Sequence, residues 1–320
     1  MNKETQTQSN FPIDVVITWV DGNDPVLNAK RAAYIKPEEA REKDIAAPNR
    51  YANRGEIYWC VRSVNKFMPW VRRIFLVTDG QDPHVESSIP VEIVDHKVIF
   101  RGYEQYLPTF CSISIEAMLW RIPGLSEHFI YLNDDLMICH PVTPGMFFPQ
   151  PGHVLVHARK SSLFWTNAWY SLKCFCGSCR VNHIQRMMNA AAITGNTHSF
   201  IRLAHTPHPL IRSTLEQFYT SHPKRLIQNI EQRFRSLQHF RTDELCYMLL
   251  YGEGKVQIKP VRPVLMRYYG KKSLMQLEWA LRRVTKPGSK VCFACFYALD
   301  KVSDKVFARI CQFAEELLKE

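Results

Sequence analysis

The stretch from Arg121 to Ile138 reads RIPGLSEHFIYLNDDLMI, and its middle decides the fold class. The run from Phe129 to Leu132 is apolar, rich in aromatic residues and without a helical period, which predicts a strand buried on both faces. Asn133, Asp134 and Asp135 follow it directly, at the strand end where open α/β sheets bind ligands. A surface turn is the ordinary alternative for these residue types. The apolar sequence LMI that comes next argues against a simple turn.

The two adjacent carboxylates also indicate a chemistry. Neighbouring anions repel each other, so Asp134 and Asp135 need a cation, a shared proton or phosphate-neutralising partners nearby. The pair therefore favours a divalent metal with a diphosphate, or general acid/base work.

Two other apolar runs lead into polar residues in the same way. Residues 13–20 run into Asp21 and Gly22, and a carboxylate on the loop leaving a first strand can reach a nucleotide or a metal. Residues 74–80 form a further predicted strand, which again ends in Asp-Gly. Between them, a polar loop leads into a helix, and Arg50 and Arg62 could clamp phosphate or pair with surface carboxylates.

Four ordered segments resemble the conserved regions of the Stealth family, namely residues 14–25, 49–81, 112–135 and 204–208. That family comprises bacterial capsule hexose-1-phosphate transferases and the lysosomal-enzyme GlcNAc-1-phosphotransferase. The resemblance spans about residues 13 to 252, and it is specific because four long, unrelated blocks recur in the right order. It implies transfer of a sugar with its phosphate from a UDP-sugar to an acceptor hydroxyl, with release of UMP.

The resemblance also implies which residues act, because attack on a diphosphate needs charge neutralisation, in-line positioning and a proton acceptor. The implied catalytic residues are Glu116, Asp134, Asp135, His205 and Arg241. The predicted substrate-binding residues are Asp21, Gly22, Asn49, Arg50, Arg62, Asn133 and His208. The predicted cofactor is Mg²⁺ or Mn²⁺ on Asp134, because a diphosphate donor and adjacent carboxylates both call for a hard cation.

Glu116 has a structural alternative, and the identity of the base stays open. A helix beginning near Ser112 or Ser114 would hold Glu116 in its first turn, where an acidic residue commonly only compensates the helix dipole. Asp135 and His205 are both candidates to take the acceptor's proton. A carboxylate bound to a metal is a poor base, so the metal ligands decide between them.

The downstream residues have alternatives as well. His205 and His208, beside a proline, would by themselves more often be structural than catalytic. Arg241 could pin a phosphate oxygen, or it could pair with Asp243 or Glu244 at the start of a helix.

Composition agrees with an enzyme that handles anions. The chain has 320 residues, 41 Lys and Arg against 30 Asp and Glu, and a pI of about 9.2. This excess predicts anionic partners: the UDP-sugar donor, a capsule polysaccharide acceptor, or an anionic membrane or export machinery at the inner leaflet. No nucleic-acid-binding module is recognisable. The N-terminus has no signal-peptide core and no run reaches a membrane span, so we expect a cytoplasmic location.

Cysteine spacing leaves one further possibility. In the cytoplasm the ten cysteines would be reduced thiols. Cys174, Cys176 and Cys179 form a dense group and Cys292 and Cys295 repeat its two-residue gap, so a zinc site competes with buried thiols.

The second half of the chain has a more helical character. Helices are predicted over residues 184–192, 209–219, 242–251, 274–284 and 302–319, with an extended segment over 255–267. The predicted organisation is a disordered tail over 1–12, a catalytic domain over 13–252 with an inserted element over 152–203, and a helical extension over 253–320. The predicted fold is α/β, with a mixed sheet resembling the nucleotide-sugar transferase A type and a helical C-terminal portion.

Two other functions compete with sugar-phosphate transfer. A conventional metal-dependent glycosyltransferase would use Asp134 and Asp135 to hold the donor diphosphate and would release UDP. A non-catalytic glycan-binding protein would keep the sheet without turnover.

Overall fold

The computed structural model describes residues 10–35, 51, 53–175, 183–260, 264–265 and 274–319. Its centre is a five-stranded sheet in the order β3-β2-β1-β4-β8. The first four strands are parallel, and β8 runs antiparallel to β4, so the predicted mixed sheet is confirmed. The strands are β1 (Ile13–Thr18), β2 (Ile74–Thr78), β3 (Val91–Asp95), β4 (His128–Asn133) and β8 (His208–Ile211).

The two middle strands are buried along almost their whole length. In β1 and β4 only the last residue is partly exposed, as expected for strands covered on both faces. The one buried charge in β1 is Asp14, whose carboxylate accepts from Arg72 at 2.8 and 2.6 Å and from the Ser126 amide at 2.7 Å. This carboxylate is therefore neutralised inside the core and has a structural role.

Two three-stranded sheets flank the central one, in the orders β10-β11-β5 and β7-β6-β9. Because β4 lies in the central sheet and β5 pairs with β11, the chain changes sheets at Asp134 and Asp135. Residues after 253 supply β9, which pairs with β6, as well as β10 and β11, so strands accompany the expected C-terminal helices. The domain boundaries stay predictions. These strands are β5 (Leu136–Ile138), β6 (Val154–Ser162), β7 (Ser199–Leu203), β9 (Val256–Lys259), β10 (Val264–Leu265) and β11 (Phe293–Cys295).

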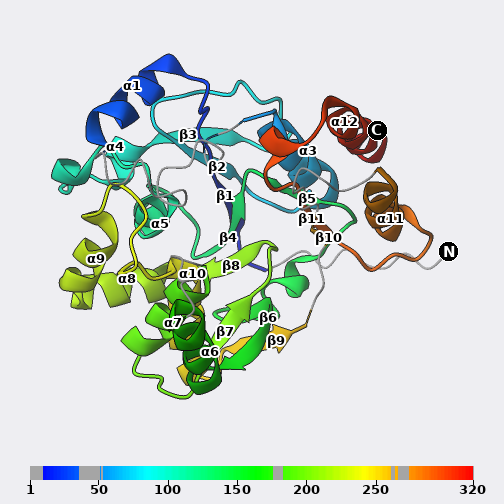
Figure 1. Ribbon diagram of the computed structural model, residues 1–320. Helices are drawn as coiled ribbons and strands as arrows, with labels where there is room; N and C mark the ends of the chain where they lie inside the picture. The colour runs from blue at the N-terminus through cyan, green and yellow to red at the C-terminus, as the bar shows by residue number, and fades with distance from the viewer. Residues whose placement is uncertain are drawn as a thin grey trace.

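Helices surround the sheets. In Figure 1, α1, α4, α5 and α9 lie to the left of the central sheet, α3, α11 and α12 lie to the right, and α6, α7 and α10 lie below it with the β7-β6-β9 sheet. The helices are α1 (Pro25–Tyr34), α3 (Glu56–Phe67), α4 (His96–Ile99), α5 (Ser112–Glu116), α6 (Leu163–Phe175), α7 (His183–Ile193), α8 (Arg212–Ser221), α9 (Pro223–Ile230), α10 (Thr242–Gly252), α11 (Leu274–Thr285) and α12 (Asp304–Leu318).

Most of the predicted helices are present, but one prediction is wrong at its start. The segment predicted as helix over 209–219 begins as strand β8, and α8 starts only at Arg212. Pro209 lies opposite Ile130 of β4, on an edge strand that tolerates a residue without an N–H donor. The apolar stripe of α12 is a packing face, since Val306, Ile310 and Phe313 are buried.

Among the described residues, no helix has the length and apolar character that a membrane crossing requires.

Candidate active site

The strand order reverses between β1 and β4, and open α/β sheets bind ligands at such a reversal. We call this place, at the carboxyl ends of the two strands, the crevice. β2 and β3 continue the sheet on one side of β1, whereas β4 and β8 continue it on the other. Thr18 at the end of β1 pairs in register with Asn133 at the end of β4. The loops that leave these two strands therefore start side by side at the carboxyl edge of the sheet.

The loop after β1 is held in place by backbone and side-chain contacts. Asp21 accepts from the Asn23 amide at 2.9 Å, and its own amide donates to Gln81 Oε1 at 2.9 Å. A Cβ on Gly22 would lie 1.8 Å from the carbonyl oxygen of Tyr51, so only glycine allows this close approach. Asp21 and Gly22 thus lie at the crevice in a fixed loop.

The turn after β4 carries Asn133, Asp134 and Asp135. It is a two-residue turn locally, but it is partly buried and leads from one sheet to another. Burial raises the pKa of Asp134 well above its usual range, with a further increase from the Asp135 charge, and burial also raises the pKa of Asp135. Asp135 Oδ2 accepts from the Cys295 thiol at 3.4 Å, while its Oδ1 is buried without a hydrogen-bond partner among the described residues.

This pair of carboxylates fits a divalent cation. A buried carboxylate oxygen without a partner calls for a proton or a cation. Within the described part of the chain, no three His, Cys, Asp or Glu side chains converge as a complete metal site. Mg²⁺, however, is commonly held by one or two carboxylates together with substrate phosphates. Asp134 and Asp135 would supply these carboxylate ligands.

A second group of polar residues lies beside the same crevice, buried except for a partly exposed Arg241. We call it the polar cluster: Glu116, Tyr131, His208, Arg241 and Asp243. The Tyr131 hydroxyl lies 3.0 Å from Thr18 Oγ1. It also lies 2.8 Å from Asn133 Oδ1 and 3.4 Å from Glu116 Oε1. Tyr131 therefore connects the polar cluster to the ends of β1 and β4.

Glu116 is one of the two acidic residues of the polar cluster, and the one whose pKa is raised. It is the last residue of α5 rather than a first-turn residue, because the helix starts at Ser112 and contains five residues. The expected position in a first turn is therefore wrong. Burial raises the pKa of Glu116 to about 7, and its Oε2 is buried without a partner among the described residues. A carboxyl group with this pKa can exchange a proton near neutral pH.

Arg241 and Asp243 form the ion pair considered as an alternative. The Nε of Arg241 donates to Asp243 Oδ1 at 2.8 Å, and its Nη2 pairs with Oδ2. Burial raises the pKa of Asp243, but the charges of Arg241 and His208 outweigh it and lower the pKa to about 2. The remaining Nη1 of Arg241 lies 3.5 Å from His183 Nδ1. Asp243 thus fixes one edge of the guanidinium and leaves Nη1 directed elsewhere.

The histidines lie next to this ion pair. His208 Nε2 is 3.6 Å from Asp243 Oδ2, and burial lowers the pKa of His208 to about 4, so its ring is neutral at pH 7. His205 stacks on His183 with ring centroids 5.6 Å apart. Burial also lowers the pKa of His183 well below its usual value. The structure therefore brings His205 and His208 to the Arg241 side of the crevice.

Other sequence candidates lie elsewhere or outside the described residues. Arg62 donates to both carboxylate oxygens of Glu315 at 2.7 and 2.9 Å, so its guanidinium is engaged with α12. Asn49 and Arg50 lie outside the described residues, as do Cys176 and Cys179 and the side chain of Cys174. No disulfide joins the cysteines that the structure describes.

Sequence reasoning missed the site positions of Tyr131, His183 and Asp243. Tyr131 had a usable signal, because residues two apart on a strand share a face and Asn133 was already a candidate. Asp243 was noted only as an ion-pair partner of Arg241. Nothing local to His183 signals its role, because its contact with His205 joins residues from different elements.

Two known family regions match this chain. The region described as "Stealth protein CR1, conserved region 1" matches residues 11–36, and "Stealth protein CR2, conserved region 2" matches residues 50–155. The segments 49–81 and 112–135, which we separated, thus fall almost entirely within one region.

Two named relatives match more of the chain. It is 34% identical over 267 residues to the capsular polysaccharide phosphotransferase cps1A of Actinobacillus pleuropneumoniae, covering 81% of this chain and 70% of the relative. It is 37% identical over 228 residues to the exopolysaccharide phosphotransferase SCO6023 of Streptomyces coelicolor, covering 71% of this chain but only 37% of that longer protein. Among solved structures, an active-site mutant of LgtC matches with a TM-score of 0.44 and 11% identity over 95% of each chain. The extent of the cps1A match and the two matching regions show that the chain belongs to the Stealth family.

Proposed function

We propose that the chain transfers hexose- or N-acetylhexosamine-1-phosphate from a UDP-sugar to a hydroxyl of a growing capsular polysaccharide, releasing UMP. One observation carries the proposal. The crevice between β1 and β4 joins a carboxylate pair suited to a metal–diphosphate to a buried cluster holding an acid and an arginine. The names of the relatives support the reaction class, since cps1A is called a capsular polysaccharide phosphotransferase.

The reaction is an in-line displacement at the phosphorus atom that bears the sugar. The acceptor oxygen forms a new P–O bond, and the bond between this phosphorus and the oxygen bridging to the uridylyl group breaks. The electron pair of that bond leaves with UMP, and the acceptor's proton passes to a protein base. The sugar keeps its own bond to phosphate, so its anomeric configuration does not change.

Arg241 would bind phosphate and Glu116 would act as the base. Asp243 orients the guanidinium of Arg241, whose Nη1 would bind a phosphate oxygen and stabilise charge in the transition state. Glu116 would accept the proton, because its pKa of about 7 suits a base at neutral pH. His208 is neutral and can donate one N–H to a phosphate oxygen. His205 and Asp135 remain the alternative bases.

Asp134 and Asp135 would hold Mg²⁺ or Mn²⁺ against the donor's diphosphate. When bound, the ion would supply positive charge that offsets the diphosphate and the leaving UMP. Asp135 would then be unavailable as a base, because a cation lowers the pKa of its ligand. We place the reaction in the cytoplasm, where UDP-sugars are available.

Product analysis tests the proposal directly. The protein is incubated with a panel of UDP-sugars and capsule oligomers, and the released nucleotide is identified by chromatography. The proposal expects UMP together with a product that carries one added phosphate per sugar. Release of UDP would instead assign a conventional glycosyltransferase, and oligomer binding without any turnover would assign a glycan-binding protein. The Glu116→Gln protein serves as the matched control, since it should bind donor but release UMP about a hundredfold or more slowly.

A further inference from the structure

One face of α11 combines exposed apolar and basic side chains. Leu277, Leu281 and Val284 form the buried face of this helix. Met275 and Trp279 are 77% and 65% exposed, which is unusual for large apolar side chains. At 100° per residue, Met275, Trp279 and Arg283 fall on one stripe opposite the buried face, and Lys286, directly after the helix, continues it. The stripe consists of these four residues, and we call it the α11 face.

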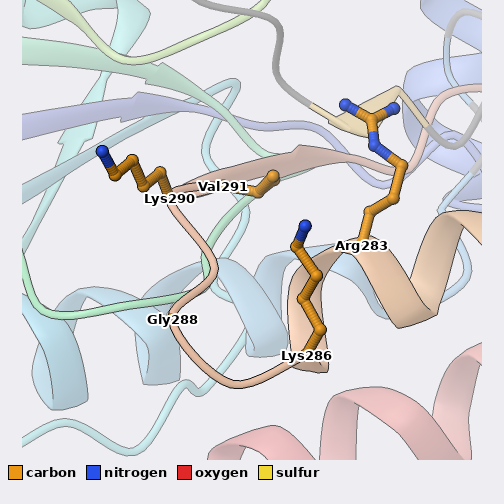
Figure 2. Close-up of a pocket in the computed structure, with 5 residues that line it drawn as sticks. All are labelled: Arg283, Lys286, Gly288, Lys290 and Val291. Atoms are coloured by element: carbon orange, nitrogen blue, oxygen red, sulfur yellow. The ribbon is translucent and has the colours of Figure 1, made fainter.

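An open pocket continues this face at the end of the helix. Its volume is about 380 Å³, and three of its five lining residues are cationic: Arg283, Lys286 and Lys290. Figure 2 shows Arg283 and Lys286 extending in the same direction from the end of α11, while Lys290 leaves the other end of the loop. The pocket therefore presents three positive charges around one concave space.

These charges are not neutralised by carboxylates that the structure describes. The ion pairs found among described residues include none at Arg283, Lys286 or Lys290. The nearest acid on α11, Glu278, is engaged by Arg309 of α12 at 2.6 Å. Arg283 instead lies over the ring of Trp279, 5.4 Å from its centroid. Attraction to the helix C-terminus explains cations near its last turn, but it explains neither Lys290 nor the two apolar side chains.

The combination identifies the kind of partner. Clustered Lys and Arg beside an exposed Trp is the arrangement by which peripheral proteins contact anionic lipid headgroups. A phosphate-bearing polysaccharide would satisfy the charges, but it offers no apolar phase for Met275. Figure 1 places α11 at the outer edge of the molecule, on the side away from α4 and α9.

We propose that the α11 face and the adjoining Lys290 dock this protein on an anionic lipid surface. Headgroup phosphates occupy the pocket, while Trp279 and Met275 enter the boundary between headgroups and acyl chains. Cys295, at the other end of β11 from this loop, contacts Asp135. The five steps of extended chain from Lys290 to Cys295 span at most about 17 Å. Docking would therefore hold the crevice close to the lipid surface without involving its residues.

Vesicle binding by the whole chain tests the proposal. Sedimentation is measured with vesicles of phosphatidylglycerol mixed with phosphatidylcholine and with vesicles of phosphatidylcholine alone. The native protein should bind the anionic vesicles and release on addition of salt. A variant with Arg283→Gln, Lys286→Gln and Lys290→Gln should bind them about a hundredfold more weakly. Each cation near an anionic surface contributes about 1 kcal/mol of binding free energy, and the variant removes three. Trp279→Gln should also weaken binding at low salt, although it removes no charge, because the apolar ring no longer enters the boundary between headgroups and acyl chains.

A matched variant removes the same charge elsewhere. Lys97, Arg101 and Lys224 are exposed and lie with α4 and α9, on the far side of the molecule in Figure 1. Their triple Gln variant should bind anionic vesicles like the native protein. Equal losses in both triple variants would overturn the proposal, because net charge alone would then explain binding. Binding of inorganic polyphosphate without vesicle binding would also overturn it and assign the face to a soluble phosphate polymer. Circular dichroism on each variant checks folding.

Discussion

Replacement of Asp243 by asparagine removes the charge that holds Arg241 inside the polar cluster. The Asp243 side chain is 1% exposed and that of Arg241 is 16% exposed, so neither partner is well hydrated. Removing one partner of a buried ion pair costs about 3–5 kcal/mol, because the remaining charge is left uncompensated. The asparagine oxygen can still accept one hydrogen bond, so we expect the low end, about 3 kcal/mol.

The pH dependence gives a second measure of the same interaction. The pKa of Asp243 is lowered from 3.8 to about 2, which corresponds to about 2 kcal/mol. A carboxyl group with a lowered folded-state pKa stabilises the protein above its unfolded pKa. That contribution is lost as the pH falls through the folded-state value. The native protein should therefore lose about 2 kcal/mol relative to Asp243→Asn between about pH 4 and pH 2.

Urea unfolding monitored by circular dichroism, at several pH values, measures both effects. Glu315→Gln is the matched control, since it removes a carboxylate from Arg62 in a pair whose side chains are 38% and 57% exposed. An exposed pair of this kind contributes less than about 1 kcal/mol. If Asp243→Asn unfolds at the same urea concentration as the control, the ion pair does not stabilise the cluster. A stability difference from native that is unchanged between pH 4 and pH 2 would contradict the proposed cause.

Three further predictions concern turnover, each followed by UMP release. Arg241→Lys should fold normally and lose about a hundredfold in rate, because a point charge replaces a planar fork; near-native turnover would remove Arg241 from phosphate binding. Excess EDTA should abolish activity, and added Mg²⁺ or Mn²⁺ should restore it. Full turnover in EDTA would show that Asp134 and Asp135 do not act by holding a metal ion. In pH–rate profiles, Glu116→Gln should remove the limb near pH 7, on the low-pH side where the base becomes protonated. Loss of that limb in His205→Gln or Asp135→Asn instead would transfer the role of base to that residue.

The sequence alone predicted those features that depend only on residues adjacent in the chain. The apolar run from Phe129 to Leu132 became β4, buried on both faces, and its end carries Asn133, Asp134 and Asp135 as expected. Local patterns determine these features, because burial on both faces requires an uninterrupted apolar segment. The family resemblance likewise rested on segments that are each continuous in the sequence.

The tertiary structure decided which distant residues meet. Arg241 at the start of α10, Glu116 at the end of α5 and His208 on β8 come from three elements, and no spacing in the chain relates them. Pro209 was expected to begin a helix over 209–219, but strand pairing with β4 outweighed that local preference. Strand order and the approach of one element to another depend on the packing of the whole core. The geometry of the site therefore appears only when the chain is folded.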